Sequence, residues 1–154
     1  MISIDEIMTP APHTLQASNS IYDARLLMKE QHIRHIPIVN DGEQLIGLIT
    51  QSDLLAASES TLQTHNDMER MELEKQHLVS EAMTTGLATI NENDNLRAAA
   101  MYLLKNKHGC LPVTRNGKLC GIITDSDFVT VAVNLMEILE QRELEPDVDP
   151  DDDF

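Results

Sequence analysis

Two spacings of apolar residues recur along this chain, and each occurs once in either half. Ile21, Ala24 and Met28 fall on one face of a helix that we expect to begin after Ser20, because this spacing is typical of amphipathic helices. Asp23, three residues after Ser20, completes the pattern of a capping box. The second half repeats the helical spacing with apolar positions at Leu96, Ala99, Ala100 and Leu103.

A pattern of short apolar runs follows each of these helices and predicts a β-hairpin. Residues 36–39 and 45–49 are such runs, and Asp41-Gly42 between them is typical of a hairpin turn. The second hairpin comprises residues 111–114 and 119–123 around Asn116-Gly117. We expect shorter extended pieces at Thr14-Leu15 and Thr89-Ile90. Each half therefore has the predicted order strand, helix, strand, strand, helix.

The two halves are copies of one another. A shift of 75 positions superimposes identical residues at Glu6, Met8, Thr9, Thr14, Ala24, Pro37 and Gly42. Beyond the turn, a shift of 74 superimposes Gly47, Ile49, Thr50, Ser52 and Asp53 on Gly121, Ile123, Thr124, Ser126 and Asp127. Two copies are too few for a solenoid, so the repeat favours a pair related by pseudo-two-fold symmetry.

The last element of the second copy is ambiguous. Residues 128–133 are rich in β-branched side chains, which is typical of a strand. The parallel with residues 54–57 of the first copy favours a helix instead. A helical stripe indeed runs through Phe128, Ala132, Leu135, Met136 and Leu139.

These patterns divide the chain into five segments. Residues 1–56 form the first repeat, residues 77–134 form the second, and residues 135–143 continue its last helix. Residues 57–76 are polar and lack Gly and Pro, so we expect a helical or mobile connector there. Residues 144–154 are acidic and interrupted by proline, so we expect a disordered tail.

Composition narrows the class of protein. The 154 residues suit one domain or two very small ones, and aromatic residues make up only 3%, so aliphatic side chains must build the core. No window approaches the roughly 18 apolar residues of a membrane span, and no signal-peptide pattern precedes the repeats. We therefore expect a cytoplasmic protein that does not associate with membranes. Cys110 and Cys120 are expected to be small buried apolar residues in a reducing compartment.

Charge argues against a nucleic-acid partner. The net charge is −15, and the residues from Glu137 onward contribute −8, with nine acidic side chains against one arginine. Residues 1–136 therefore carry −7. A binder of phosphate backbones needs a footprint of lysine and arginine that this body lacks.

The ordered set of motifs resembles the CBS domain, the repeat first described in cystathionine β-synthase. In each copy Met-Thr, a capped helix, an apolar run containing proline, a hairpin turn and Gly-x-Ile-Thr-x-x-Asp follow one another. The resemblance covers nearly all of residues 1–56 and 77–134. It implies an α+β fold in which two pseudo-symmetric β-α-β-β-α repeats pack sheet to sheet, with two clefts between them. It also implies a free-standing pair that assembles into a homodimer.

Members of this family that bind ligands use the Thr-x-x-Asp motif to hold a ribose. The resemblance assigns ribose binding to Thr50, Asp53, Thr124 and Asp127. A carboxylate suits this role because it only accepts hydrogen bonds, whereas the ribose diol offers two donors. The alternative is that the same motif is a capping box, in which each aspartate caps the helix that follows it.

The resemblance also assigns adenine and phosphate contacts. The adenine set comprises Thr9, Thr14, Leu15, Ile36, Pro37, Thr84, Thr89, Ile90, Leu111 and Pro112. Its apolar members, Leu15 and Ile90 above all, have the alternative role of ordinary core residues. The phosphate set comprises His32, Arg34, His35, Lys107 and His108. Gly109 and Cys110 replace Arg34 and His35 in the second copy, and Ser52 and Ser126 precede the aspartates where many members carry arginine.

From these residues we expect a non-catalytic regulatory module. An AMP-like ligand is favoured over a polyphosphate, although AMP, ADP, ATP, S-adenosylmethionine and NAD all carry the adenosyl group. We expect the module to report to an unidentified regulated protein. The alternative function is a ligand-free module for protein interaction or assembly. We expect no metal site, because no cysteine or acidic cluster completes His32-x-x-His35. No nucleophile, acid–base pair or cofactor loop that would indicate an enzyme emerges.

Overall fold

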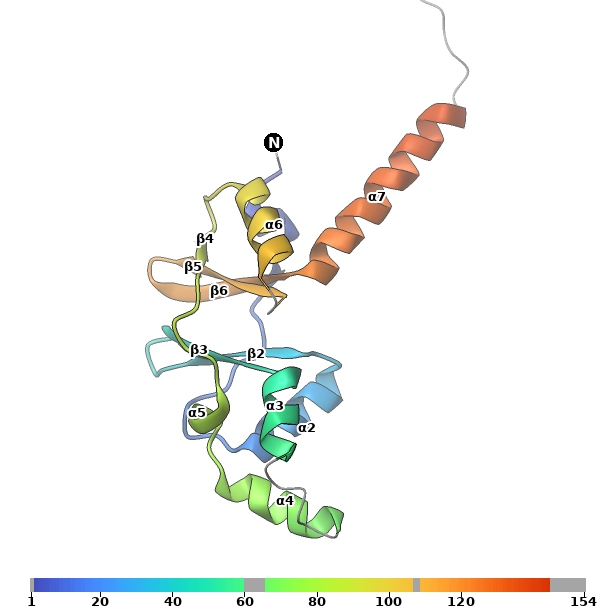
Figure 1. Cartoon of the computed structure of the whole chain (residues 1–154). Coiled ribbons are helices and arrows are strands. Elements are labelled where there is room, and N and C mark those ends of the chain that lie inside the picture. Colours follow the sequence, from blue (N-terminus) through green and yellow to red (C-terminus); the bar gives the residue numbers. More distant parts are fainter. Residues whose placement is uncertain (1, 60–65, 107–108, 145–154) are drawn as a thin grey trace, which may run out of the picture.

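Two sheets face each other at the centre of the structure (Figure 1). The computed structural model describes residues 2–59, 66–106 and 109–144. One sheet pairs β2 (His35–Val39) with β3 (Leu45–Thr50). The other has the strand order β1-β6-β5-β4. Its strands are β1 (Thr9–Pro10), β4 (Ile90–Asn91), β5 (Cys110–Arg115) and β6 (Lys118–Thr124).

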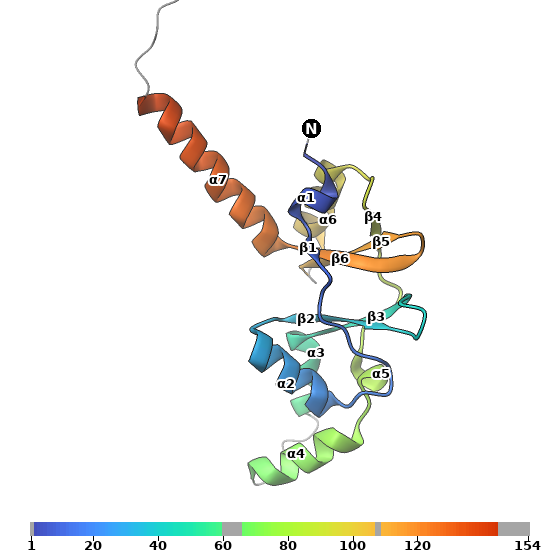
Figure 2. The ribbon, with the colours of Figure 1, turned by 180° about the vertical axis from the view of Figure 1, so that it is seen from behind.

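Helices cover the outer side of each sheet, so the molecule has four layers (Figures 1 and 2). Over the β2–β3 sheet lie α2 (Ile21–Gln31), α3 (Gln51–Glu59) and α5 (Val79–Ala82), with α4 (Asp67–Gln76) packed on α2. Over the other sheet lie α1 (Ile4–Ile7), α6 (Leu96–Lys105) and the first turns of α7 (Asp125–Leu144). The α+β fold with two repeats packed sheet to sheet is confirmed.

The predicted capping box and the helical interpretation of the last element are both confirmed. The Ser20 side chain accepts the Asp23 N–H at 3.1 Å, and the Asp23 carboxylate accepts the Ser20 N–H at 2.9 Å. Residues 128–133 lie within α7. Phe128 packs against the second core, whereas the β-branched residues Val129 and Val133 are exposed.

Parts of the connector and the tail lie outside the described residues. Helix α3 continues beyond residue 56 to Glu59, and α4 begins at Asp67, so the described part of the connector is helical. Helix α7 continues to Leu144, and the remainder of the expected tail, residues 145–154, falls outside the described range. None of the helices in the described ranges is long and apolar enough to cross a membrane.

Both predicted hairpins are present, but their turns differ. In β5–β6, Asn116 and Gly117 both have positive φ (52° and 78°), which is the geometry that favours an Asn-Gly turn. In β2–β3 the positive φ falls on Glu43 (63°) rather than on Gly42. The one extra residue of the first repeat is accommodated there, and the Asn40 side chain closes the loop by accepting the N–H groups of Gly42 and Gln44.

The first segment of each repeat packs on the other repeat. Ile4 of α1 is fully buried in the core of the second repeat, against residues that include Leu111 and Ile123. Val79 of α5 is fully buried in the core of the first repeat with Ile21. Each core is therefore built from most of one repeat and the opening segment of the other. The predicted boundaries, 1–56 and 77–134, instead keep each opening segment with its own repeat.

The exchange continues as strand pairing. Thr9 of β1 pairs with Ile122 of β6, and Thr84 forms an isolated bridge with Leu48 of β3. Thr84 and Leu48 exchange both backbone hydrogen bonds, at 2.9 and 2.8 Å. Unfolding one repeat therefore exposes a segment of the other, and we expect the two repeats to unfold together.

Candidate functional site

Two glycines let the crossing segments lie flat against the sheets. A Cβ at Gly47 would lie 3.2 Å from the Thr84 carbonyl oxygen and would overlap Met83. A Cβ at Gly121 would lie 3.0 Å from the Thr9 carbonyl oxygen and would overlap Met8. Both glycines are therefore required by close approach of backbone, which explains why Met-Thr and Gly recur together in the two copies.

The Thr-x-x-Asp motif of the first repeat caps α3. The Asp53 carboxylate accepts the Thr50 N–H at 2.9 Å through Oδ2, and Thr50 Oγ1 accepts the Asp53 N–H at 3.1 Å. The Thr84 hydroxyl also donates to Asp53 Oδ2, at 3.5 Å. Asp53 Oδ1 accepts no hydrogen bond from the described part of the chain. The capping alternative is thus realised here, with one carboxylate oxygen left over.

The motif of the second repeat forms only the aspartate half of the capping box, and its aspartate is more fully occupied. Asp127 Oδ2 accepts the Thr124 N–H at 2.9 Å and lies 3.4 Å from the Thr124 hydroxyl. Asp127 Oδ1 accepts the Thr9 hydroxyl at 3.3 Å. Because both of its oxygens are engaged within the protein, Asp127 has less capacity for a ligand than Asp53.

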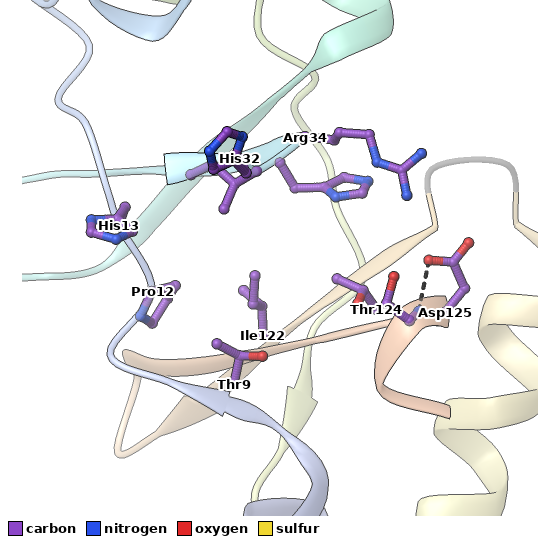
Figure 3. A pocket seen from close by; sticks show the side chains of 11 residues that line it. Thr9, Pro12, His13, His32, Arg34, Ile122, Thr124 and Asp125 are labelled. Carbon is purple, nitrogen blue, oxygen red and sulfur yellow. Dashed lines mark hydrogen bonds between the residues drawn. The ribbon is translucent and has the colours of Figure 1, made fainter. Parts of the chain in front are cut away.

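A pocket lies between the two repeats where the predicted cations meet the second motif. Its wall from the first repeat carries His32, Arg34 and His35. Figure 3 shows that Thr124 and Asp125 lie across the pocket from Arg34. The remaining lining residues are Thr9, Pro12, His13, Ile33, Ile122 and Ser126. The pocket therefore combines basic groups from one repeat with hydroxyl groups from the other.

A second pocket adjoins the first at the other motif. It is lined by Thr50, Gln51, Ser52 and Asp53 of the first repeat, with Gly109 of the second. Arg34, His35 and Asp125 line both pockets. The same three ionisable side chains would therefore be near a ligand in either pocket.

Comparison with known families identifies the repeats. The sequence profile of the CBS domain matches residues 4–60 and 79–134. The chain belongs to the CBS domain family. One Thr-x-x-Asp motif and one crossing Met-Thr segment fall within each matched CBS domain.

Named CBS relatives are similar over most of this chain. The chloroplastic CBS domain-containing proteins CBSX1 and CBSX2 of Arabidopsis thaliana are 30% and 29% identical, over 86% of this chain. The chain spans 65% and 64% of their lengths. Among solved structures, a candidate acetoin utilization protein (AcuB) of Vibrio cholerae is 42% identical with a TM-score of 0.79, covering 91% of this chain and 98% of that one. CBSX2 in complex with AMP is 29% identical with a TM-score of 0.73, covering 88% and 99%.

The structure brings together only part of the predicted CBS ligand set. Thr9, His32, Arg34, His35 and Thr124 line the first pocket, and Thr50 and Asp53 line the second. Thr14 lines a separate hollow beside Cys120, and Thr89 is exposed. Lys107 and His108 lie outside the described residues.

The structure places the apolar members of the predicted adenine set in the cores and sheets rather than in the two pockets. None of these apolar members lines either pocket, and all are at least partly buried in the two cores or in the sheets: Leu15, Ile36, Pro37, Ile90, Leu111 and Pro112. Ile36 and Pro37 have almost no exposed surface, because they lie on a strand that is buried on both faces. The packing supports the core role left open for Leu15 and Ile90. The adenine role of this set stays a prediction.

Asp125 is the acidic residue among the pocket residues that the sequence did not predict, which also include Pro12, His13, Ile33 and Ile122. It is exposed, begins α7, and accepts the Ser126 N–H at 2.9 Å. Its counterpart in the first repeat is Gln51, which is uncharged. The position of Asp125 directly after Thr124, inside the Thr-x-x-Asp motif, is the feature of the sequence that could have predicted it.

Cys110 lies behind the pocket and is shielded. It pairs with Thr124 in the sheet and is 3% exposed. Burial, with smaller contributions from the charges of Asp127 and Asp125, raises the pKa of the Cys110 thiol to about 12. Both cysteines are free thiols, and no three His, Cys, Asp or Glu side chains gather as metal ligands within the described ranges.

Proposed function

We propose that this protein is a non-catalytic regulatory module that binds an adenosyl ligand, AMP or one of similar charge, between its two CBS domains. The observation that supports the proposal most directly is that Arg34 and His35 line both pockets, with Thr50 and Asp53 in the second pocket and with Thr124 in the first. A nucleoside monophosphate needs both kinds of group, since its phosphate pairs with cations and its ribose donates to oxygen acceptors. The AMP complex of CBSX2 supports the ligand class.

The two aspartates differ in what they can offer a ribose. Asp53 keeps Oδ1 for a ligand hydroxyl while Oδ2 continues to cap α3. A ribose hydroxyl at Asp127 competes with the Thr9 hydroxyl for Oδ1. We therefore propose Thr50 and Asp53 as the first ribose site to fill. Filling the second weakens the bond between Asp127 and Thr9 of the crossing segment, which gives ligand binding a structural consequence that a partner protein can detect.

The charge of the pocket favours a single phosphate group. Among the described residues that line the two pockets, Arg34 is the one permanently cationic side chain, and Asp125 lines both pockets with it. Each further phosphate adds negative charge near that carboxylate, and like charges in a partly desolvated site repel. AMP or a zwitterionic adenosyl compound such as S-adenosylmethionine is therefore preferred to ATP.

Thermal unfolding with AMP, ADP, ATP, S-adenosylmethionine and NAD tests the proposal. A ligand at 100 times its dissociation constant adds about 2.7 kcal/mol of stability, which raises the midpoint by roughly 5–10 °C for a chain of this size. Arg34→Ala should remove most of the shift. Arg70→Ala, an exposed arginine on α4, should leave the shift intact.

A ligand-free assembly module is the second candidate function. It is favoured by the caps themselves, because Asp53 and Asp127 have structural partners without any ligand. If no adenosyl compound moves the midpoint while Asp53→Ala and Asp127→Ala each lower it by about 1 kcal/mol, the assembly function replaces the sensor. We also propose that the protein acts as a homodimer. The cytoplasmic location expected from the sequence stays a prediction.

A further inference from the structure

The first CBS domain carries a covering helix that has no counterpart over the second among the described residues. Helix α4 packs on the outer side of α2. The Arg25 side chain of α2 forms an ion pair with Glu74 of α4, with Nη2 and Oε1 2.8 Å apart, and Glu74 is buried. Lys75 of α4 also lies over the Tyr22 ring, 5.1 Å from its centre. An acidic helix thus closes the outer face of this repeat.

The equivalent face of the second CBS domain is apolar and open. The 75-residue repeat places Ala100, Met101 and Leu104 of α6 where α2 has Arg25, Leu26 and Lys29. Met101 is 43% exposed and Leu104 is 80% exposed. Arg97 and Lys105 flank them, also exposed. We call residues 97, 101, 104 and 105 the α6 face.

The distal half of helix α7 carries an apolar stripe that is exposed. Its first turns contact β6 and α1, but every residue from Val133 to Leu144 is exposed. Leu135, Met136 and Leu139 continue the stripe that begins at the core residue Phe128. The distal half also carries Glu137, Glu140 and Glu143 against one arginine, Arg142, so its net charge is −2. Helix α7 runs away from the body in both views, so it does not reach the α6 face of its own chain (Figures 1 and 2).

We propose that the distal half of α7 from a second copy of this chain covers the α6 face, in the place that α4 takes on α2. The two surfaces match in length, since twelve residues of α7 span about 18 Å and the ten of α6 about 15 Å. They also match in character, because an apolar stripe on a helix segment of net charge −2 meets an apolar face that carries Arg97 and Lys105. Arg97 then has the role toward the partner's α7 that Arg25 has toward Glu74.

Two-fold symmetry doubles this contact. When each copy offers its α7 to the α6 of the other, the same contact forms twice and the assembly closes as a dimer. Doubling brings two small helix–helix contacts toward the roughly 800 Å² per partner of a stable interface. This inference deepens the proposed homodimer and is independent of ligand binding.

The mass of the full chain in solution is the first test. Light scattering after gel filtration should give twice 17.2 kDa for the wild type. Leu139→Glu on α7 and Leu104→Glu on α6 should each give a monomer with an unchanged circular dichroism spectrum. Met68→Glu, which changes a 70% exposed methionine on α4, is the matched control and should stay dimeric. A monomeric wild type overturns both the dimer and the surface.

Cross-linking between different copies tests the pairing itself. In a Cys120→Ser background, chains carrying Met101→Cys are mixed with chains carrying Met136→Cys under mild oxidation. Cys110 is buried and stays out of the reaction. A disulfide-linked dimer in the mixture, but in neither variant alone, is the expected result. If the wild type is dimeric but the mixture does not cross-link, or Met136→Cys links to itself, the α6 pairing is wrong while the homodimer stands.

Discussion

The Thr9 hydroxyl donates to Asp127 Oδ1 at 3.3 Å although 118 residues separate the two in the sequence. The Thr84 hydroxyl lies 3.5 Å from Asp53 Oδ2 in the corresponding position. Each capping aspartate is therefore tied to the segment that crosses over from the other repeat. The strand-to-helix junction that we propose to bind ribose is also the junction that holds the two repeats together.

Replacing Thr9 by Val should destabilise the protein without changing its shape. The variant loses the hydroxyl that bonds to Asp127, and a hydrogen bond to a charged group contributes about 1.5–3 kcal/mol when it is buried and less when it is exposed. Because Thr9 is exposed, we expect a loss of about 1 kcal/mol and a fall of roughly 2–4 °C in the midpoint of thermal unfolding. Thr14→Val, at an exposed threonine of the same segment, is the control and should be near neutral. Equal effects of the two substitutions would show that the bond to Asp127 contributes nothing.

Local patterns predicted the elements of this fold well, and the reason is visible in individual residues. Ser20 and Asp23 cap α2 through short-range bonds that three residues of sequence specify. Asn116-Gly117 makes its turn because both residues tolerate positive φ. The exchange of Ile4 and Val79 between the cores was not predictable in this way. An apolar residue in a four-residue helix carries no information about which of two similar cores it enters.

The site was predicted less completely than the fold. The resemblance assigned adenine, phosphate and ribose contacts to Thr9, Arg34 and Thr124 respectively, and the structure brings these three residues to one pocket. It also assigned adenine contacts to Ile36 and Pro37, which line neither pocket because they lie on a strand that is buried on both faces. Burial on the second face depends on how the two sheets meet, and no local pattern encodes that.

Asp125→Asn should relax the selectivity of the pocket. Removing this carboxylate leaves Arg34 as the dominant charge, so the affinity for ATP should rise relative to that for AMP by on the order of three- to tenfold. The amide oxygen of asparagine can still accept the Ser126 N–H, so the start of α7 should be undisturbed. Isothermal titration of both nucleotides measures the ratio.

Asp41→Asn is the control for Asp125→Asn, because Asp41 is an exposed carboxylate in the β2–β3 turn. It should leave the ratio of ATP to AMP affinity unchanged. If AMP binds to Asp125→Asn with the same preference over ATP as in the wild type, Asp125 does not select the ligand, although the proposed adenosyl site would remain.

The two thiols should react at very different rates. Burial raises the pKa of both cysteines, to about 12 for Cys110, and Cys120 is the less buried of the two. The thiolate is the reactive form, so Cys110 should react with a maleimide at pH 8 only as fast as the protein opens. Cys120→Ser should abolish the fast phase and Cys110→Ser the slow one. Fast labelling of Cys110 in the folded protein would contradict its placement behind the pocket.

Asp23 should make the stability of the protein sensitive to acid. The backbone N–H of Ser20 donates to its carboxylate and, with smaller contributions from Asn19 and the Ser20 side chain, lowers the pKa of Asp23 against an opposing effect of burial. A pKa that is lower in the folded state means that the ionised carboxylate stabilises the fold. This contribution is complete above the unfolded pKa of about 3.9 and is lost as the pH falls through the lower folded value. The difference in unfolding free energy between wild type and Asp23→Ala, measured by urea denaturation, should therefore be constant from pH 5 to 7 and shrink below about pH 4. A difference that persists undiminished to pH 2.5 would show that Asp23 acts through packing rather than charge.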